Sequence, residues 1–252
     1  MIDPATIALA AGAGLLGGTM NALAGGGTFA TMPSLIALGL PSPIANATSN
    51  VALTPGAAAS AWTYRDGIGP VGGLSIRQLA GITFVGGFFG SLLLVVTPTR
   101  TFDLLIPWLL LLATVVLAFG KSAANWLHAR VTIGVRTLFG AQTLLAVYGG
   151  YFGGGVGLMM TATWGLLAGA EPHRLMAPRT LMLATANMAA ALVFVWFDMV
   201  SWPLCLAMMG GALLGGWLGA KVGQRLSPVV IRYWTLTVTV VTTAIFFWRA
   251  YA

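Results

Sequence analysis

Acidic side chains are scarce in this chain: five occur among 252 residues, and charged residues of both signs make up only 7% of it. A water-soluble domain carries about 25% charged residues, so this composition cannot supply a water-facing surface. The acids all fall in predicted loops or at the ends of apolar segments: Asp3, Asp66, Asp103, Glu171 and Asp198. No carboxylate is therefore expected at membrane depth to carry a proton or to bind a cation.

Cysteine and catalytic motifs are scarce as well. The single cysteine, Cys205, lies in an apolar segment, which excludes an internal disulfide and a cysteine-based metal cluster. The sequence also lacks a phosphate-binding loop, a pair of metal ligands at helical spacing and a nucleophile with a plausible base. We therefore expect no enzyme activity, no metal and no cofactor. The net charge of +7 comes from basic residues scattered singly through loops, which indicates membrane topology and not nucleic-acid binding.

Long apolar runs dominate what is present. Hydrophobic residues make up 58% of the chain, and the mean hydropathy is +0.91. A helix needs about 20 apolar residues to cross a bilayer core of about 30 Å. We predict an all-α polytopic membrane protein with ten apolar segments, at residues 6–23, 28–38, 45–64, 76–96, 104–119, 131–151, a short piece ending near 168, 174–197, 203–222 and 228–247.

Two glycine triplets, at residues 25–27 and 153–155, divide the segments into two similar sets of five. The stretch NALAGGGTFATM around the first resembles VYGGYFGGGVGLMM around the second. Residues 1–120 and 121–252 are therefore predicted to be two transmembrane repeats of one integral membrane unit. The piece after each triplet is too short to span alone, so a re-entrant-like hairpin followed by three spanning helices is expected in each repeat. The segment count stays open between eight and ten.

Basic residues predict the orientation of the repeats. Placing the loop that contains Arg65 and Arg77 in the cytoplasm puts nearly all other basic residues there as well, and leaves only Arg100 and Arg249 outside. The corresponding loop of the second repeat contains Asp198 and no basic residue, and it falls outside, so the repeats are expected to be inverted. Both termini are then expected outside, and we expect a location in the bacterial inner (plasma) membrane.

The glycine triplets are also the first candidate binding site. Secondary transporters are built from inverted repeats with broken helices, and their substrate lies between the repeats near the bilayer midplane. The start of each short helix presents unpaired N–H groups and the positive end of a helix dipole, so two such starts can hold an anion. Close helix packing is the alternative explanation for the glycines. The substrate-binding residues predicted here are Gly25, Gly26, Gly27, Thr28, Gly153, Gly154 and Gly155.

Polar side chains at membrane depth extend this candidate site. Asn46, Thr48, Ser49 and Asn50 crowd the start of the third segment and are predicted to bind substrate, because polar groups there need partners. Alternatively, Asn46 or Thr48 caps the helix. Asn187, near the middle of its segment, is either a substrate ligand or a group that hydrogen-bonds across helices.

Arg179 is a charged residue inside a predicted span, where insertion of such a charge costs about 2.5–3.5 kcal/mol. We predict that it is the counter-charge of an anionic substrate. The alternative is that its side chain snorkels to the cytoplasmic headgroups, because the start of the segment is near.

The run GGGTFATMPSLIALGLPSPIANATSNVALTPGAAASAWTYR, with a weaker echo in the second half, resembles the sulfite exporter TauE/SafE family of membrane transporters. The resemblance spans nearly the whole chain. The second-half run LMAPRTLMLATAN resembles the family's Asn-Ala-x-Lys block, with Met176 where the family often has asparagine and Arg179 where it often has lysine. The resemblance implies export or import of small sulfur-containing anions such as sulfite or organosulfonates.

We therefore expect a secondary transporter of such anions that works by alternating access between inverted repeats. Its expected partners are the small anionic substrate and the lipid bilayer, without nucleic acid, and a homo-oligomer stays open. The main alternative is an anion channel, which can use the same residues without an alternating barrier. A membrane enzyme or an assembly scaffold is the weakest alternative, because no catalytic pair exists.

Overall fold

Helices make up most of the computed structural model, which describes residues 3–128, 134–169 and 174–251. Within these ranges it contains ten α-helices and no strand. Six of these helices are long and apolar enough to cross a membrane: α1 (Pro4–Ala24), α4 (Ile76–Val95), α5 (Thr99–His128), α8 (Met176–Trp196), α9 (Trp202–Gly223) and α10 (Pro228–Tyr251). The predicted all-α, multi-pass architecture is confirmed.

Four further helices complete the described part: α2 (Thr28–Ala37), α3 (Ser42–Thr63), α6 (Val135–Tyr151) and α7 (Val156–Ala168). Helix α3 begins before the predicted start at residue 45, with Pro43 in its first turn, where a missing backbone N–H is tolerated. Asn46 and Thr48 therefore lie inside the helix and do not cap it.

Helix α5 continues beyond its predicted end at residue 119, so the predicted boundary between the repeats at residue 120 lies inside a helix. Two parts of the sequence-based predictions, Glu171 and residues 131–133 of the sixth segment, lie outside the described residues.

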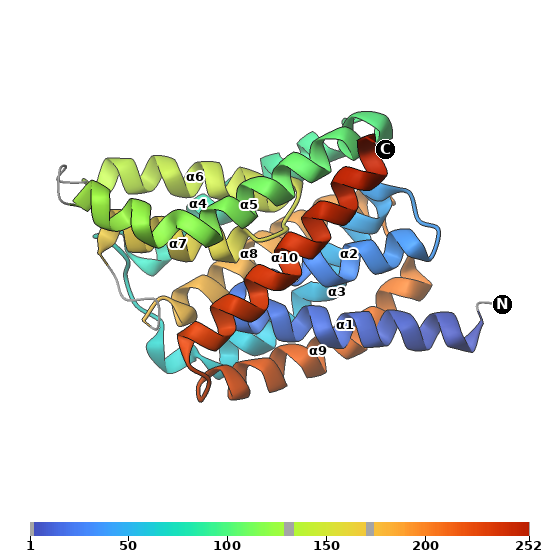
Figure 1. Ribbon diagram of the computed structural model, residues 1–252, viewed down its shortest axis with the longest axis horizontal. Helices are drawn as coiled ribbons and strands as arrows, with labels where there is room; N and C mark the ends of the chain where they lie inside the picture. Colours follow the sequence, from blue (N-terminus) through green and yellow to red (C-terminus); the bar gives the residue numbers. More distant parts are fainter. Residues whose placement is uncertain (1–2, 129–133, 170–173, 252) are drawn as a thin grey trace.

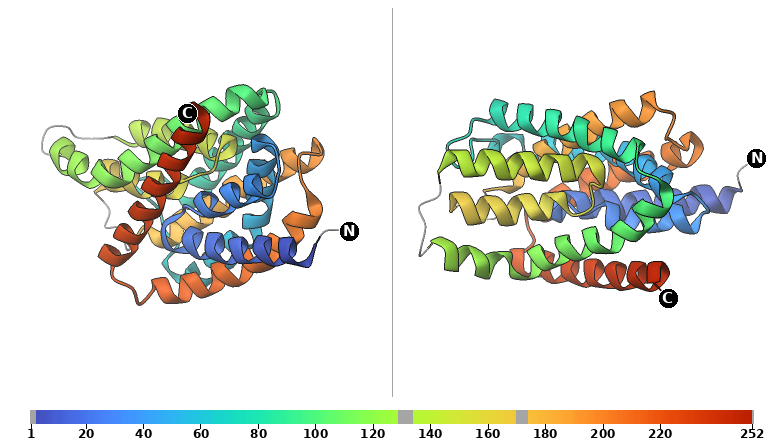
Figure 2. Two further views of the ribbon diagram at one scale, coloured as in Figure 1. Left: turned by 45° about the vertical axis from the view of Figure 1, so that its right-hand side comes forward. Right: turned by 90° about the horizontal axis from the view of Figure 1, so that it is seen from above.

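Each glycine triplet lies at the tip of a helical hairpin. Helices α1 and α2 form one hairpin and α6 and α7 the other, and the two extend toward each other from opposite ends of the molecule (Figure 1, Figure 2). Gly25, Gly153 and Gly155 have φ angles of 80°, 74° and 75°, in the left-handed region that residues with a Cβ rarely adopt. Glycine therefore lets the chain reverse direction within a few residues at both tips.

Helix α9 packs closely against both α1 and α3 through glycines. A Cβ on Gly14 of α1 would lie 2.0 Å from the carbonyl oxygen of Met208, and a Cβ on Gly18 would lie 2.3 Å from that of Ala212. A Cβ on Gly56 of α3 would lie 2.2 Å from the same Ala212 oxygen. Small residues allow such close approach between helices in membranes. This register also shows that α1 and α9 run in the same direction.

Several helices begin or finish at one end of the molecule, which we call the basic end. Helices α3 and α9 finish there, and α4, α6 and α8 begin there. A Cβ on Gly67 would lie 3.2 Å from the Ala177 side chain, and one on Gly223 would lie 2.6 Å from the Tyr64 hydroxyl. Six of the basic residues predicted to be cytoplasmic lie in or next to these helix ends: Arg65, Arg77, Arg136, Arg174, Lys221 and Arg225. The start of α1 and the end of α10 lie toward the opposite end (Figure 2).

Candidate functional site

The two hairpin tips touch through bare backbone. The N–H of Gly157, in the first turn of α7, donates a hydrogen bond of 3.3 Å to the carbonyl oxygen of Gly25. A Cβ on Gly25 would lie 2.5 Å from the Gly157 Cα, and one on Gly157 would lie 2.7 Å from the Gly25 Cα. A side chain at either position would displace the other hairpin. The structure thus brings the two predicted glycine triplets together in the interior of the molecule.

Polar side chains from three helices converge on the second tip. A Cβ on Gly153 would lie 3.6 Å from Asn50 Nδ2 and 3.7 Å from Thr28 Oγ1. Asn50 Nδ2 donates a hydrogen bond of 3.4 Å to Asn187 Oδ1 on α8. Thr28, Asn50 and Asn187 are all buried. Four of the predicted site residues, from α2, α3, α8 and the α6–α7 tip, therefore lie close together.

Asn46 lies one helical turn before Asn50 and contacts the same tip. Its Nδ2 donates a hydrogen bond of 3.1 Å to the carbonyl oxygen of Tyr151, the last residue of α6. The Oδ1 atoms of Asn46 and Asn50 are buried without a hydrogen-bond partner in the described part of the chain. An unpaired buried acceptor costs about 1–3 kcal/mol, so native proteins rarely keep one. Both oxygens can accept a hydrogen bond from a bound ligand or water.

The other two members of the α3 cluster have different partners. The Ser49 hydroxyl lies 2.5 Å from the Thr31 hydroxyl on α2, so Ser49 faces the first hairpin. Thr48 Oγ1 accepts a hydrogen bond of 3.0 Å from the backbone N–H of Ser201, directly before α9. The structure therefore places Thr48 beside the α8–α9 connection and not at the hairpin tips.

Side chains from the preceding helices hold both tips in shape. Asn21 Oδ1 on α1 accepts a hydrogen bond of 3.3 Å from the Gly27 N–H. The Tyr148 hydroxyl on α6 donates one of 2.7 Å to the Gly154 carbonyl oxygen. The N–H groups of Gly27 and Gly157 are thus already bonded within the protein. An anion at the tips has to use other donors or to replace these bonds.

Arg179 lies in the first turns of α8 and is 4% exposed, so its side chain does not snorkel to the surface. Its Nη2 donates hydrogen bonds to the carbonyl oxygens of Ala22 at 2.8 Å and Leu23 at 3.3 Å, in the last turn of α1. A cation is favourable there because the last carbonyls of a helix carry partial negative charge. Its Nε is buried and has no hydrogen-bond partner among the described residues. Arg179 thus joins α8 to α1 directly before the Gly25 tip.

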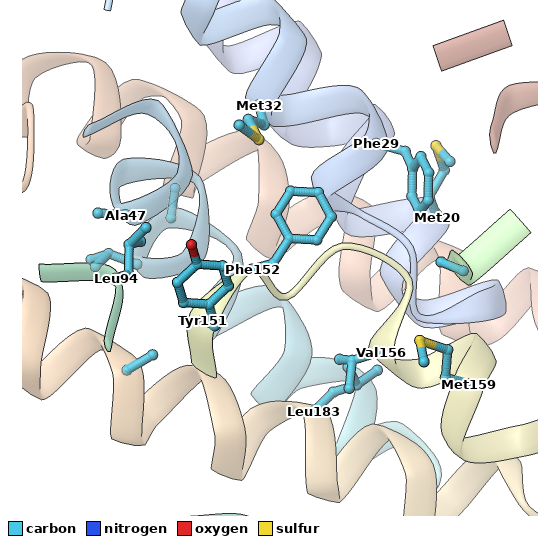
Figure 3. Close-up of a cluster of buried hydrophobic side chains, with 14 of the residues drawn as sticks. Met20, Phe29, Met32, Ala47, Leu94, Tyr151, Phe152, Val156, Met159 and Leu183 are labelled. Carbon is cyan, nitrogen blue, oxygen red and sulfur yellow. The ribbon is translucent and has the colours of Figure 1, made fainter. Parts of the chain in front are cut away.

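Apolar side chains enclose the meeting point of the tips (Figure 3). Phe152 is 1% exposed and lies between Tyr151 and Phe29 in this view. Met32 and Met159 belong to the same hydrophobic cluster. The sequence-based site residues do not include these aromatic residues. The signal that points to Tyr151 and Phe152 is their position directly before the second glycine triplet.

Comparisons with known proteins agree with a membrane transporter. The family model described as Sulfite exporter TauE/SafE matches residues 10–246. A probable membrane transporter protein of Haemophilus influenzae is 28% identical, with 87% of this chain and 86% of that protein covered. The probable membrane transporter protein YfcA of Escherichia coli K12 is 26% identical, with 90% and 82% covered. No solved structure matches this chain.

Proposed function

The chain belongs to the sulfite exporter TauE/SafE family of membrane transporters, and we propose that it is a secondary transporter of sulfite or organosulfonates. Two similar proteins are named as probable membrane transporters. One observation carries the mechanistic part of the proposal. Two glycine-broken hairpins from opposite ends of the molecule meet inside it, beside buried asparagines on α3 and α8.

The proposed substrate site is this meeting point. Asn50, Asn187 and Thr28 surround the second tip, Asn46 binds its backbone, and Ser49 lies beside the first hairpin. We assign Thr48 a supporting role at the start of α9, because its hydroxyl is bonded there. The proposed binding residues are Gly25, Gly26, Gly27, Thr28, Asn46, Ser49, Asn50, Gly153, Gly154, Gly155, Arg179 and Asn187.

The charge distribution supports an anionic substrate. Arg179 is the only charged side chain among the buried residues of the described part of the chain. Sulfite and sulfonate oxygens are hydrogen-bond acceptors, and a guanidinium is a strong, charged donor for such groups. In the proposed mechanism the Arg179 guanidinium exchanges its bonds to the last turn of α1 for bonds to the substrate.

The opposed hairpins also support two inverted repeats, with the boundary between them moved from residue 120 to the end of α5. Alternating access would then be a movement of one repeat against the other, with the Gly25–Gly157 contact at the interface between them. From the positive-inside rule we propose that the basic end faces the cytoplasm and that both termini lie outside. The proposed location is the bacterial inner membrane.

Ligand binding to detergent-purified protein tests the proposal. Sulfite, sulfoacetate, taurine, sulfate and chloride are added separately, and thermal unfolding is followed. A ligand at 100 times its Kd stabilises the folded state by about 2.7 kcal/mol, which is easily detected. We expect stabilisation by one sulfur oxyanion, loss of it in Arg179→Ala, and partial retention in Arg179→Lys. The control is Arg77→Ala, which removes an exposed arginine at the basic end. No stabilisation by any of the sulfur anions would contradict the proposed substrate class.

A further inference from the structure

A cavity of 810 Å³ opens at the basic end, between the end of α3 and the start of α8. Its volume is in the range of about 300–1,000 Å³ that is typical of small-molecule sites. The side chains that matter for its chemistry are those of Thr63, Tyr64, Asp66, Arg174 and Gln224. None of these residues belongs to the binding site proposed above.

Tyr64 lines this cavity, and its hydroxyl is an unusual group. It is buried and has no hydrogen-bond partner in the described part of the chain. A Cβ on Gly223 would lie 2.6 Å from this hydroxyl and 2.9 Å from the Leu23 side chain. The hydroxyl therefore lies where α9 meets the last turn of α1. Buried tyrosine hydroxyls normally find a partner, so an unpaired one indicates a binding group.

Arg179 is the second polar group near the last turn of α1. It follows Pro178, which lines the cavity, and it lies close enough to Tyr64 to interact with it electrostatically. Its Nη2 is bonded to the Leu23 carbonyl oxygen, whereas its Nε is buried and has no partner in the part of the chain that the structure describes. An O–H and a charged N–H, both without a partner among the described residues, thus lie near the last turn of α1.

The charges of the cavity are compatible with an anion. Arg174 contributes a positive charge to the wall. The one acid among the lining residues, Asp66, is 92% exposed and lies 3.8 Å from the Arg65 guanidinium, which offsets its charge at the rim. A positive charge in a cleft raises the local concentration of anions.

We propose that this cavity is the entrance for the transported anion at the basic end, and that the anion moves from it to the Tyr64 hydroxyl and the Arg179 Nε–H, which bind its oxyanion group beside the cavity. The identity of the anion rests on the proposed function, whereas the site rests on the cavity and the two unpaired donors. An anion bound here draws the Arg179 guanidinium away from the last turn of α1. Since Gly25 follows that turn directly, binding at the entrance is coupled to the first hairpin tip.

Cysteine labelling tests the charge of the cavity. A Cys205→Ala protein receives Thr63→Cys in the cavity, and Thr137→Cys at the exposed start of α6 is the matched control. Detergent-purified protein is labelled with 2-sulfonatoethyl methanethiosulfonate, an anion, or with its trimethylammonium counterpart, a cation. We expect the anion-to-cation rate ratio to be about tenfold higher at Thr63→Cys than at the control. Equal ratios at the two positions would overturn the proposal.

Protection by added anions tests the role of Tyr64. Sulfoacetate is expected to slow labelling of Thr63→Cys, and this protection should be lost when Tyr64→Phe removes only the hydroxyl. Tyr233→Phe makes the same change at a residue that is 67% exposed and should keep the protection. Unchanged protection in Tyr64→Phe would refute the assignment of the hydroxyl. Protection by sulfate or phosphate but not by sulfoacetate would support an oxyanion site at Tyr64 and contradict the sulfonate substrate of the proposed function.

Discussion

The contact between the hairpin tips makes Gly157→Ala the most informative substitution. The new Cβ would lie 2.7 Å from the Gly25 Cα and 2.9 Å from the Leu183 side chain, so one hairpin has to move. Overpacking of this kind lowers the free energy of unfolding by about 1–3 kcal/mol. Gly157 has no positive φ, unlike Gly25, so the substitution tests the close approach without adding backbone strain.

Gly12→Ala is the matched control, because a Cβ on Gly12 of α1 has no neighbour within 4 Å. Replacing glycine by alanine inside a helix stabilises it by about 0.5–1 kcal/mol. Gly157 also lies in a helix, so this gain applies to both variants, and they should differ by about 1–3 kcal/mol in unfolding by sodium dodecyl sulfate in mixed micelles, followed by tryptophan fluorescence.

Transport should separate the same two variants. If substrate binds between the tips, Gly157→Ala displaces its binding groups, and uptake into proteoliposomes should fall by at least about tenfold, equivalent to 1.4 kcal/mol. Gly12→Ala should transport at the wild-type rate. A Gly157→Ala protein that is as stable and as active as Gly12→Ala would refute the tip-to-tip contact and the site built on it.

Three further predictions follow from other contacts. The Gln142 side chain accepts a hydrogen bond of 2.9 Å from Trp164 and donates one of 2.8 Å to Thr83. Gln142→Leu should therefore lower the free energy of unfolding by about 1–3 kcal/mol, and a thermal-shift titration should show unchanged substrate affinity. Thr48→Val removes the hydrogen bond to Ser201 and should lower the free energy of unfolding by about 0.5–1.5 kcal/mol while transport continues. Loss of substrate binding in this variant would show that Thr48 belongs to the binding site. Tags at both termini should react with a membrane-impermeant reagent in intact cells, and protection of either tag would contradict the predicted topology.

Much of the helical architecture could be predicted because hydropathy and glycine act locally. The apolar runs indicated the spans, and the triplets marked both hairpin tips, since only glycine readily adopts the positive φ seen at Gly25, Gly153 and Gly155. The helix boundaries were less accurate. Because α3 begins at Ser42, Asn46, Ser49 and Asn50 share a face at i, i+3 and i+4, whereas Thr48 points elsewhere. That difference follows from helical periodicity once the start is known.

The partners of Arg179 and the entrance cavity could not be predicted from the sequence. The carbonyl groups that Arg179 binds belong to the last turn of α1, more than 150 residues away in the chain. Nothing near Tyr64 in the sequence indicates a binding group, because its environment depends on how Gly223 of α9 packs against the end of α1. Such contacts depend on tertiary packing and leave no local pattern.

Counterflow in proteoliposomes tests the central claim, alternating access for a sulfur oxyanion, most directly. Liposomes that contain the purified protein are loaded with unlabelled sulfite or sulfoacetate and diluted into a trace of the radiolabelled anion. A carrier with one alternating site is predicted to accumulate the label transiently above equilibrium, with a saturable rate that falls in Arg179→Ala. Label that only equilibrates, together with an electrical current far above carrier turnover, would contradict alternating access and favour a channel. Absence of any flux with sulfite and sulfoacetate would contradict the substrate class.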